Sequence, residues 1–462
     1  MNLFEQLDRH ILGRLPPVEA GQVYAVGGCV RDLLLGRHPQ DYDLAVSVSP
    51  ARFADRIATD LRGRWVMLGH GDQQIYRVVT EDSILDIAKV SGATIETDLK
   101  RRDYTVNAMA CDLATGQVID PTGGLADLKS GTVCMVSVNG LRRDPLRMIR
   151  AYRLAAQFAW KLDPATARAI QSERKRIRSV AGERVWSEIQ KILATQPSLA
   201  VMDQMIAGGL LFEVLPELTP LLQSETGRRN GMHHLLSAYG ILERLLENPA
   251  ELAPRTLSSP KQLLADIPAD LLKLSLLLHE AGRPQPSAAG TADGDDRCAA
   301  ALAYQVCRRL RTSVRQADYV AFILQHHLRP LRLYAGHPNP RERLRAQVQF
   351  FLDCHPRVPD VLLHATADQL AEFNAENANK AGAFKTFVQA LLDTYYREMR
   401  PRIEAPPLLT GSDLKQSFHL KPSPQFRTIL KELQEARLMG EIRNRADALD
   451  WVRAWVDGQK PL

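Results

Sequence analysis

Short apolar runs alternate with helical stretches over the first 138 or so residues. The runs are rich in β-branched residues and are separated by turn-forming residues, which is typical of strands. They read VYAVGG (23–28), DYDLAVSV (41–48), RWVMLG (64–69), IYRVVT (75–80), SILDIA (83–88) and TVCMVSV (132–138). Between the second and third runs, the segment ARFADRIATDLRG (51–63) has the spacing of a helix. The pattern predicts a mixed α/β domain, a small sheet with helices.

From Asp144 onward the strand-like runs stop, and apolar residues recur at helical spacing almost to the C-terminus. The first turns of this pattern use Leu146, Ile149, Ala151, Leu154, Ala155 and Phe158. We therefore expect an α/β head followed by an all-α neck, body and tail. The predicted boundaries are 1–138 for the head, 139–215 for the neck, 216–400 for the body and 401–462 for the tail.

Composition places the chain among globular proteins. Its 462 residues are 45% hydrophobic and 24% charged, which excludes a disordered or fibrous chain. The N-terminus lacks the apolar stretch of a signal peptide, and no segment reaches the eighteen or so apolar residues that span a bilayer. Six cysteines without a C-x-x-C pair indicate neither a zinc site nor a disulfide framework. We expect a soluble cytoplasmic protein with no membrane partner.

The positive charge is concentrated in the predicted neck. The whole chain has a surplus of +6, whereas residues 139–191 contain thirteen basic and five acidic residues, a surplus of +8. The remainder is therefore about −2. Such a basic belt fits a phosphate backbone, and an ordinary solvated helical surface is the alternative.

Two features of the head suggest nucleotide chemistry. Gly27 and Gly28 follow a strand and precede a helix start that contains Arg31 and Asp32, an arrangement that lets the backbone approach a phosphate. Asp41 and Asp43 lie two residues apart on the next strand, so both side chains project from one face. Paired carboxylates repel each other unless a cation lies between them, and hard oxygen ligands suit Mg²⁺. Taken singly, each feature also fits an ordinary turn or strand end.

Two further segments combine arginine with aspartate. LKRRDYTVNAMA (99–110) places Arg101, Arg102 and Asp103 before a short helix. RRDPLRMIRAYRLAAQF (142–158) places Asp144 and Arg147 three residues apart, so a carboxylate acceptor and a guanidinium donor lie side by side. A simple intrahelical ion pair is the alternative for the second segment.

Together and in this order, the motifs resemble the class II tRNA nucleotidyltransferase and bacterial poly(A) polymerase family, a branch of the polymerase beta-like nucleotidyltransferases. The resemblance is strong over residues 22–215 and looser beyond them. Six motifs support it: GGCVRD (27–32), DYD (41–43), RRDYTVNA (101–108), DPTGGLADL (120–128), DPLRMIRAYRLAA (144–156) and GERVWSE (182–188).

The resemblance implies a nucleotidyltransferase head with a two-metal site. It makes Asp41 and Asp43 the ligands of two Mg²⁺ ions, one activating the RNA 3′-hydroxyl and the other stabilising the departing pyrophosphate. Asp86, in SILDIA, is the candidate for a third catalytic carboxylate. The resemblance assigns nucleotide binding to Gly27, Gly28, Arg31 and Arg102. Asp103 and Asn107 are expected to brace their loop.

The resemblance also implies that the protein itself selects the base. Asp144 accepts from the exocyclic amine of cytosine or adenine, Arg147 donates to the adjacent ring acceptor, and uracil and guanine leave these groups unpaired. Arg150 and Arg153 match positions that bind phosphate or base in relatives. The chain departs from the common pattern at Arg143, where an acidic residue is usual.

Histidines of the body resemble those of an HD-type phosphohydrolase domain. His233, His234, His279, Glu280, His326 and His327 lie in GMHHLLSAYG, LLLHEAGRPQ and LQHHLRPLRL. An active HD site has aspartate where this chain has Glu280, so we expect a helical scaffold rather than a hydrolase.

The predicted function is template-independent addition of C, A or both to the 3′ end of tRNA from CTP and ATP with release of pyrophosphate. The expected partners are therefore tRNA, CTP, ATP and Mg²⁺. The first alternative is a poly(A) polymerase, and more distant ones are an HD-type phosphohydrolase and a non-catalytic RNA-binding protein.

Overall fold

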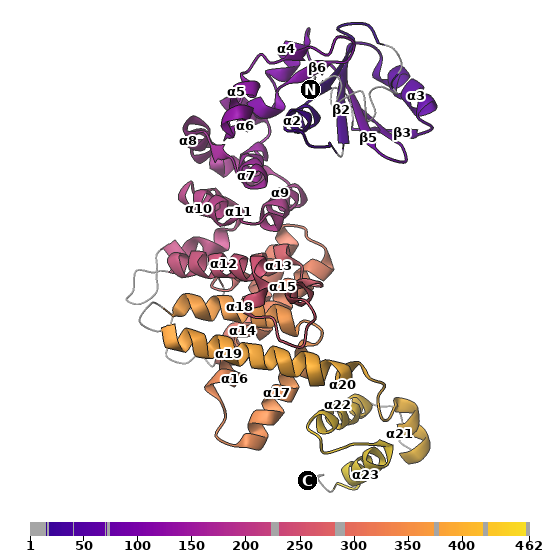
Figure 1. Cartoon of the computed structure of the whole chain (residues 1–462), viewed down its shortest axis with the longest axis vertical. Helices are drawn as coiled ribbons and strands as arrows, with labels where there is room; N and C mark the ends of the chain where they lie inside the picture. Colours follow the sequence, from indigo (N-terminus) through magenta and orange to yellow (C-terminus); the bar gives the residue numbers. More distant parts are fainter. Residues whose placement is uncertain are drawn as a thin grey trace. The chain divides into compact units, whose positions relative to one another are not determined.

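The computed structural model describes residues 15, 18–39, 41–69, 71, 74–222, 231–281, 292–373, 378–418 and 424–458. The chain divides into two compact units, Met1–Pro216 and Glu217–Leu462. Figure 1 shows the strands confined to the first unit and the second built from helices. The predicted fold class, an α/β head followed by helices, is thus confirmed, whereas the four predicted boundaries stay predictions.

The head contains a seven-stranded mixed sheet with strand order β3-β4-β5-β2-β1-β6-β7. The strands are β1 (Val23–Val26), β2 (Asp41–Val46), β3 (Arg64–Leu68), β4 (Ile75–Val79), β5 (Ile84–Lys89), β6 (Ala110–Asp112) and β7 (Val118–Ile119). Only β2 and β5 pair in parallel, and every other neighbouring pair is antiparallel. The first five strands confirm the predicted runs, whereas β6 and β7 are too short to stand out in the sequence.

Alternation along β2 divides the head into two faces. Tyr42 and Leu44 join a buried core with residues of α2 (Gly28–Leu34) and α3 (Pro50–Asp60). Ala45 points the other way, into a smaller core with residues of α4 (Ile95–Leu99). Because side chains alternate with period two, Asp41 and Asp43 share the face of Ala45. The carboxylates thus lie on the face opposite α2 and α3.

The rest of the first unit is mainly helical. Its helices are α5 (Gly124–Ser130), α6 (Val138–Arg143), α7 (Arg147–Phe158), α8 (Pro164–Glu173), α9 (Gly182–Ala194), α10 (Leu199–Ala207) and α11 (Leu210–Val214). Two predictions for this region are wrong in detail. The run 132–138 forms only β8 (Thr132–Val133), because the Ser137 hydroxyl accepts a hydrogen bond from Gly140 N and starts α6. β8 pairs in parallel with β9 (Lys161–Leu162), a strand inside the segment predicted as helical.

The second unit is built around α18 (Val358–Glu372), whose residues are buried from Val358 to Leu370. Around it lie α12 (Gly231–Glu247), α13 (Ala269–Leu278), α14 (Ala292–Arg309), α15 (Val314–His326), α16 (Arg329–Ala335), α17 (Pro340–Cys354) and α19 (Ala378–Thr394). After α20 (Arg400–Glu404), α21 (Gly411–Phe418), α22 (Pro424–Leu438) and α23 (Arg445–Val456) form a separate hydrophobic core. None of the described helices combines the length and apolar character needed to cross a bilayer.

Candidate active site

The carboxylates predicted for metal binding lie on two adjacent parallel strands. Asp41 and Asp43 are both exposed on β2, while Tyr42 between them is buried. Asp43 stands opposite Asp86 of β5 in the parallel register, so both side chains point to the same face. The structure therefore brings together the three carboxylates that the sequence analysis selected.

Arg77 holds the third carboxylate and was missed by the sequence analysis. It lies on β4 opposite Asp86, and its Nε and Nη2 atoms each donate a hydrogen bond of 2.8 Å to one Asp86 oxygen. This bidentate pair fixes the orientation of Asp86 and neutralises its charge. The alternation of IYRVVT places Arg77 on the same face as Asp86 once the strand order is known.

Asp43 faces both repulsive and attractive charges. Loss of hydration raises its pKa most, Arg102 lowers it, and Asp86 and Asp41 raise it further, so the net pKa lies above the usual value. Neighbouring carboxylates that oppose ionisation in this way would be relieved by a cation among them. The oxygen donors of Asp41 and Asp43 thus fit a hard divalent metal ion.

Gly27 brings its backbone close to the same carboxylate. Its φ of +75° favours glycine, and a Cβ there would lie 2.8 Å from Arg102 Nη1 and 3.5 Å from Asp43 Oδ2. Arg102 is itself held by Asp98, at 3.1 Å. The turn, the guanidinium and the carboxylate therefore form one continuous surface beside β2.

The predicted phosphate-binding residue Arg31 is buried, with 7% of the residue exposed. Its guanidinium pairs with Asp32 at 2.8 Å, donates to Asn107 Oδ1 at 2.5 Å and lies 4.7 Å from the centre of the Phe158 ring. The sequence analysis did not foresee these three contacts, of which those to Asn107 and Phe158 join α2 to the segment before β6 and to α7.

A chain of hydrogen bonds and ion pairs continues from that loop into the helices. Asn107 Nδ2 donates to Asp103 Oδ1 at 3.2 Å, and Arg150 Nη1 donates to Asp103 Oδ2 at 3.0 Å. Arg150 and Arg153 then share Glu188 of α9, at 3.5 Å and 2.6 Å. Burial alone would raise the pKa of Asp103, but the charge and hydrogen bond of Arg150 outweigh it and lower the pKa. The contacts agree with the bracing expected of Asp103 and Asn107.

The two predicted base-reading residues make separate contacts: Asp144 directly follows α6, and Arg147 begins α7. Arg147 Nη1 donates to the backbone carbonyl oxygens of Arg101 and Arg102, at 3.1 Å and 3.0 Å. The Asp144 carboxylate pairs with Arg184 of α9, at 3.3 Å. The two side chains do not pair with each other in any contact recorded for the described residues. Arg184 is a second residue that the sequence analysis missed.

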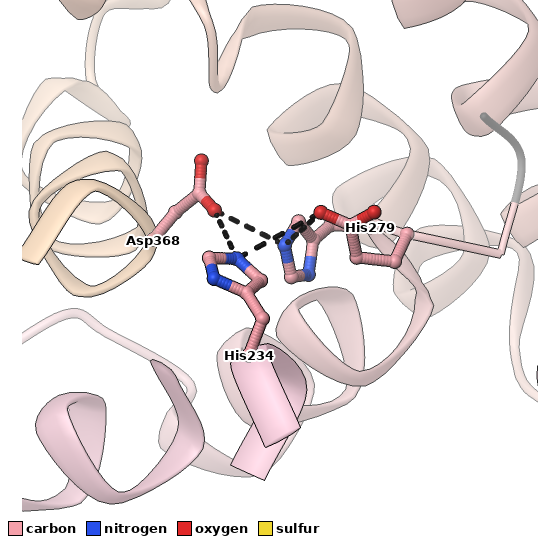
Figure 2. A group of neighbouring side chains, drawn as sticks. His234, His279 and Asp368 are labelled. Carbon is pink, nitrogen blue, oxygen red and sulfur yellow. Dashed lines mark hydrogen bonds and ion pairs between the residues drawn. The ribbon is translucent and has the colours of Figure 1, made fainter. Parts of the chain in front are cut away.

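The histidines of the body have different environments. His233 is exposed on α12, and the His326 ring lies tilted against that of Phe322, 4.6 Å away, whereas His327 is buried with its ring 6.1 Å from that of His279. His234, His279 and Glu280 come together with Asp368 of α18, which the sequence analysis missed (Figure 2). Burial lowers the pKa of His279, but hydrogen bonds to Asp368 and Glu280 outweigh it and raise the pKa to about 9. The two carboxylates therefore favour positive charge at this point.

Comparisons with known proteins match most of the chain. The family model described as "Poly A polymerase head domain" matches residues 23–134, and the one described as "Probable RNA and SrmB- binding site of polymerase A" matches residues 160–222. The CC-adding tRNA nucleotidyltransferase of Synechocystis sp. is 31% identical over 454 residues, covering 96% of this chain and 94% of the relative. The A-adding tRNA nucleotidyltransferase of Deinococcus radiodurans is 30% identical over 455 residues, covering 96% and 97%.

Solved structures show the same fold. A CCA-adding enzyme of Thermotoga maritima complexed with tRNA has a TM-score of 0.62 at 21% identity, covering 94% of this chain and 91% of the other. A CCA-adding enzyme in complex with ATP has a TM-score of 0.66 at 19% identity, covering 100% and 94%.

Proposed function

The chain belongs to the tRNA nucleotidyltransferase and bacterial poly(A) polymerase family and is an enzyme of the nucleotidyl-transfer type, and from this premise we propose that it adds C, A or both to the 3′ end of tRNA. CTP and ATP are the donors, and pyrophosphate is released. The observation that supports this most is the similarity over nearly the whole length to a CC-adding and to an A-adding enzyme, at 31% and 30% identity. The cytoplasmic location expected from the sequence stays a prediction.

We assign metal binding to Asp41 and Asp43, with Mg²⁺ as the ion. Their exposure on one face and the raised pKa of Asp43 support a site for a hard cation. Mg²⁺ bound there would activate the RNA 3′-hydroxyl and stabilise the pyrophosphate leaving group. Asp86 is the third carboxylate of this proposal, and two hydrogen bonds from Arg77 hold it on the face of Asp43.

Nucleotide binding in this proposal uses the surface beside β2. The backbone at Gly27 and Gly28 approaches the triphosphate, and the neighbouring Arg102 supplies positive charge. The nucleotide-binding roles of Arg31, Arg150 and Arg153 stay predictions. The ion pairs that these three arginines make within the protein support an additional positioning role for each.

Base selection in this proposal uses Asp144 and Arg147. Asp144 directly follows α6, and Arg147 begins α7 and is anchored to the loop that contains Arg102. The Asp144 carboxylate is also paired with Arg184, and its two oxygens can accept from that guanidinium and from a base amine at the same time. Arg184 therefore tunes how readily Asp144 accepts a hydrogen bond from the incoming base.

The proposed function is tested by extension assays with Mg²⁺ and each nucleotide supplied separately. The substrates are tRNAs that lack CCA, CA or only the terminal A, together with an oligo(A) primer. We expect extension of at least one tRNA by CTP or ATP, and none by UTP or GTP. Long tails on oligo(A) would contradict the tRNA assignment in favour of the poly(A) polymerase alternative, and failure to extend any RNA would contradict both.

Matched variants test the metal assignment in the same assay. Asp41→Asn and Asp43→Asn should each abolish incorporation while tRNA binding persists, because removing a ligand charge weakens the site without changing its shape. Asp82→Asn, at an exposed position in the β4–β5 turn, is the control and should retain wild-type rates. Activity of either metal-site variant within tenfold of the control would refute the assignment.

A further inference from the structure

An apolar surface lies open on the part of the sheet formed by β3 and β4. Of the ten large apolar side chains recorded as exposed among the described residues, five belong to these two strands. Two of the five point to the face of α3, where Trp65 Nε1 donates to Asp55 at 3.3 Å. The other three point to the opposite face, and their exposed fractions are 51% for Val66, 40% for Leu68 and 46% for Val79. Exposed apolar side chains that cluster in this way commonly mark a surface that binds a partner.

Strand register places this surface on the face of the proposed metal-binding carboxylates. Asp43 of β2 stands opposite Asp86 of β5. Asp86 stands opposite Arg77 of β4, and Arg77 stands opposite Val66 of β3. Directly paired residues of adjacent strands project to the same face, so these four residues form one row across the sheet. At about 4.8 Å per strand, the row is about 14 Å long and joins the carboxylates to the apolar surface.

A second row runs beside the first and ends in a positive charge. It starts at Asp41 and reaches Val79 and Arg64 through Ile84 of β5. Arg64 is exposed, and its side chain makes no ion pair or hydrogen bond that is recorded within the described ranges. Its guanidinium therefore remains available to an anionic group from outside the protein.

The proposed triphosphate site lies on the other side of Asp43. Gly27 directly follows β1, which borders β2 on the side away from β5. A Cβ on Gly27 would lie 3.5 Å from Asp43 Oδ2, so this backbone is the nearest neighbour of the carboxylate in that direction. In nucleotidyl transfer the attacking and departing oxygens lie roughly in line, on opposite sides of the phosphorus. If the pyrophosphate leaves toward β1, the attacking RNA hydroxyl arrives from the side of β5, β4 and β3.

We propose that the single-stranded 3′ end of the RNA lies on the open sheet surface, which is formed by Arg64, Val66, Leu68 and Val79. This inference rests on the proposed function, because it is the RNA 3′-hydroxyl that must reach the carboxylates. Apolar side chains suit the faces of the bases and a guanidinium suits a phosphate, whatever the RNA sequence. The length of the row matches about four stacked nucleotides at about 3.4 Å each. Continuity with the carboxylates favours RNA over a protein partner, which would block this approach to them.

A photochemical crosslink tests the contact directly in the full-length protein. The photoreactive residue p-benzoylphenylalanine is placed at position 66 or, as the control, at position 67. Val66 and Met67 have the same exposed fraction, 51%, and point to opposite faces of β3. With bound tRNA that lacks the terminal A, position 66 should crosslink to one of about the last four nucleotides, and position 67 should give less than about a tenth of that yield. The absence of a crosslink from position 66, a crosslink to another part of the tRNA or to a second copy of the chain, or equal yields from the two positions would overturn the proposal.

Steady-state kinetics separate RNA docking from nucleotide binding. Val66→Ser and Arg64→Gln should each raise KM for tRNA by about fivefold or more, as expected for the loss of one base or phosphate contact, and leave KM for the nucleotide unchanged. The matched controls Met67→Ser and Arg56→Gln, the latter on α3, should keep the wild-type KM for tRNA. Equal effects of a variant and its control, or a higher KM for the nucleotide alone, would overturn the proposal. A wild-type protein that binds tRNA but extends no RNA would instead contradict the proposed function, and the crosslink distinguishes this result because it requires binding alone.

Discussion

Replacing Asp103 by asparagine tests whether this carboxylate holds the loop of Arg102 in place. The substitution preserves size and one acceptor oxygen but removes the charge that pairs with Arg150. Asp103 also accepts hydrogen bonds from the Tyr104 backbone N–H and the Asn107 amide. Its loss of charge should therefore loosen the loop without changing any residue that we assign to substrate binding.

The expected effect is about 2 kcal/mol. A hydrogen bond to a charged group contributes about 1.5–3 kcal/mol, and breaking a fully buried pair costs about 3–5 kcal/mol. The range of about 1.5–3 kcal/mol applies here, because 28% of the Arg150 side chain is exposed and Arg150 keeps Glu188 as a second partner. A change of 2 kcal/mol corresponds to about a 30-fold increase in the equilibrium constant for local opening.

Amide hydrogen exchange of the full-length protein measures this opening locally. Residues 103–108 should exchange about 30-fold faster in Asp103→Asn than in the control Asp82→Asn. In a double-mutant cycle with Arg150→Gln, the coupling should reach about 1–2 kcal/mol. A change of less than threefold, or additive effects of the two substitutions, would refute the bracing role.

The pH dependence of this effect has a defined sign. The pKa of folded Asp103 lies below its usual value, so its stabilisation is fully present above the unfolded pKa and is lost as pH falls through the folded pKa. The difference between wild type and Asp103→Asn should be constant from about pH 5 to 8 and shrink below about pH 4. A difference that grows on acidification would contradict the ion pair.

Three further predictions concern other parts of the chain. Gly27→Ala should lower kcat/KM for tRNA extension by about tenfold or more, because the added Cβ would enter the space beside Asp43. The control Gly36→Ala, at a similar positive φ but in open space, should keep the wild-type kcat/KM. Equal effects of the two substitutions would contradict the close approach at Gly27. Lys273→Met should lower the free energy of unfolding by about 3–5 kcal/mol, because buried Glu243 would lose the ammonium group that now lies 2.7 Å away. Adding Glu243→Leu should restore most of that loss, as measured by chemical denaturation. An absence of recovery would refute the explanation. The affinity for tRNA should fall steeply as salt concentration rises, and Lys175→Ala should reduce the slope of log K against log salt by about one. A binding constant that does not change with salt would contradict contact of the basic neck with RNA.

The sequence was informative where function depends on local spacing. The alternation of DYD correctly predicted that Asp41 and Asp43 share a face, because the period of a strand is two. Five of the six apolar runs of the head likewise became strands of the large sheet, whereas the run 132–138 formed only β8. Fold class therefore followed from local periodicity, and the family followed from the order of six short motifs between residues 27 and 188.

Partners that depend on tertiary structure could not be predicted in this way. Arg184 is 40 residues from Asp144, and Asp368 is 134 residues from His234. Neither the helix period nor the strand period relates residues so far apart, so a single sequence does not reveal these contacts. Arg77 is nearer to Asp86, but its role depends on which strands are neighbours in the sheet. These residues became visible only once the backbone brought them together.

The burial of α18 has a consequence for biosynthesis. The ribosome makes α12 more than a hundred residues before α18, so the apolar face of α12 lacks this partner while the intervening chain is translated. At bacterial elongation rates that interval is on the order of ten seconds. The first unit is complete before this interval begins. We therefore expect nascent chains arrested between α13 and α18 to be the form of this protein that chaperones bind most strongly.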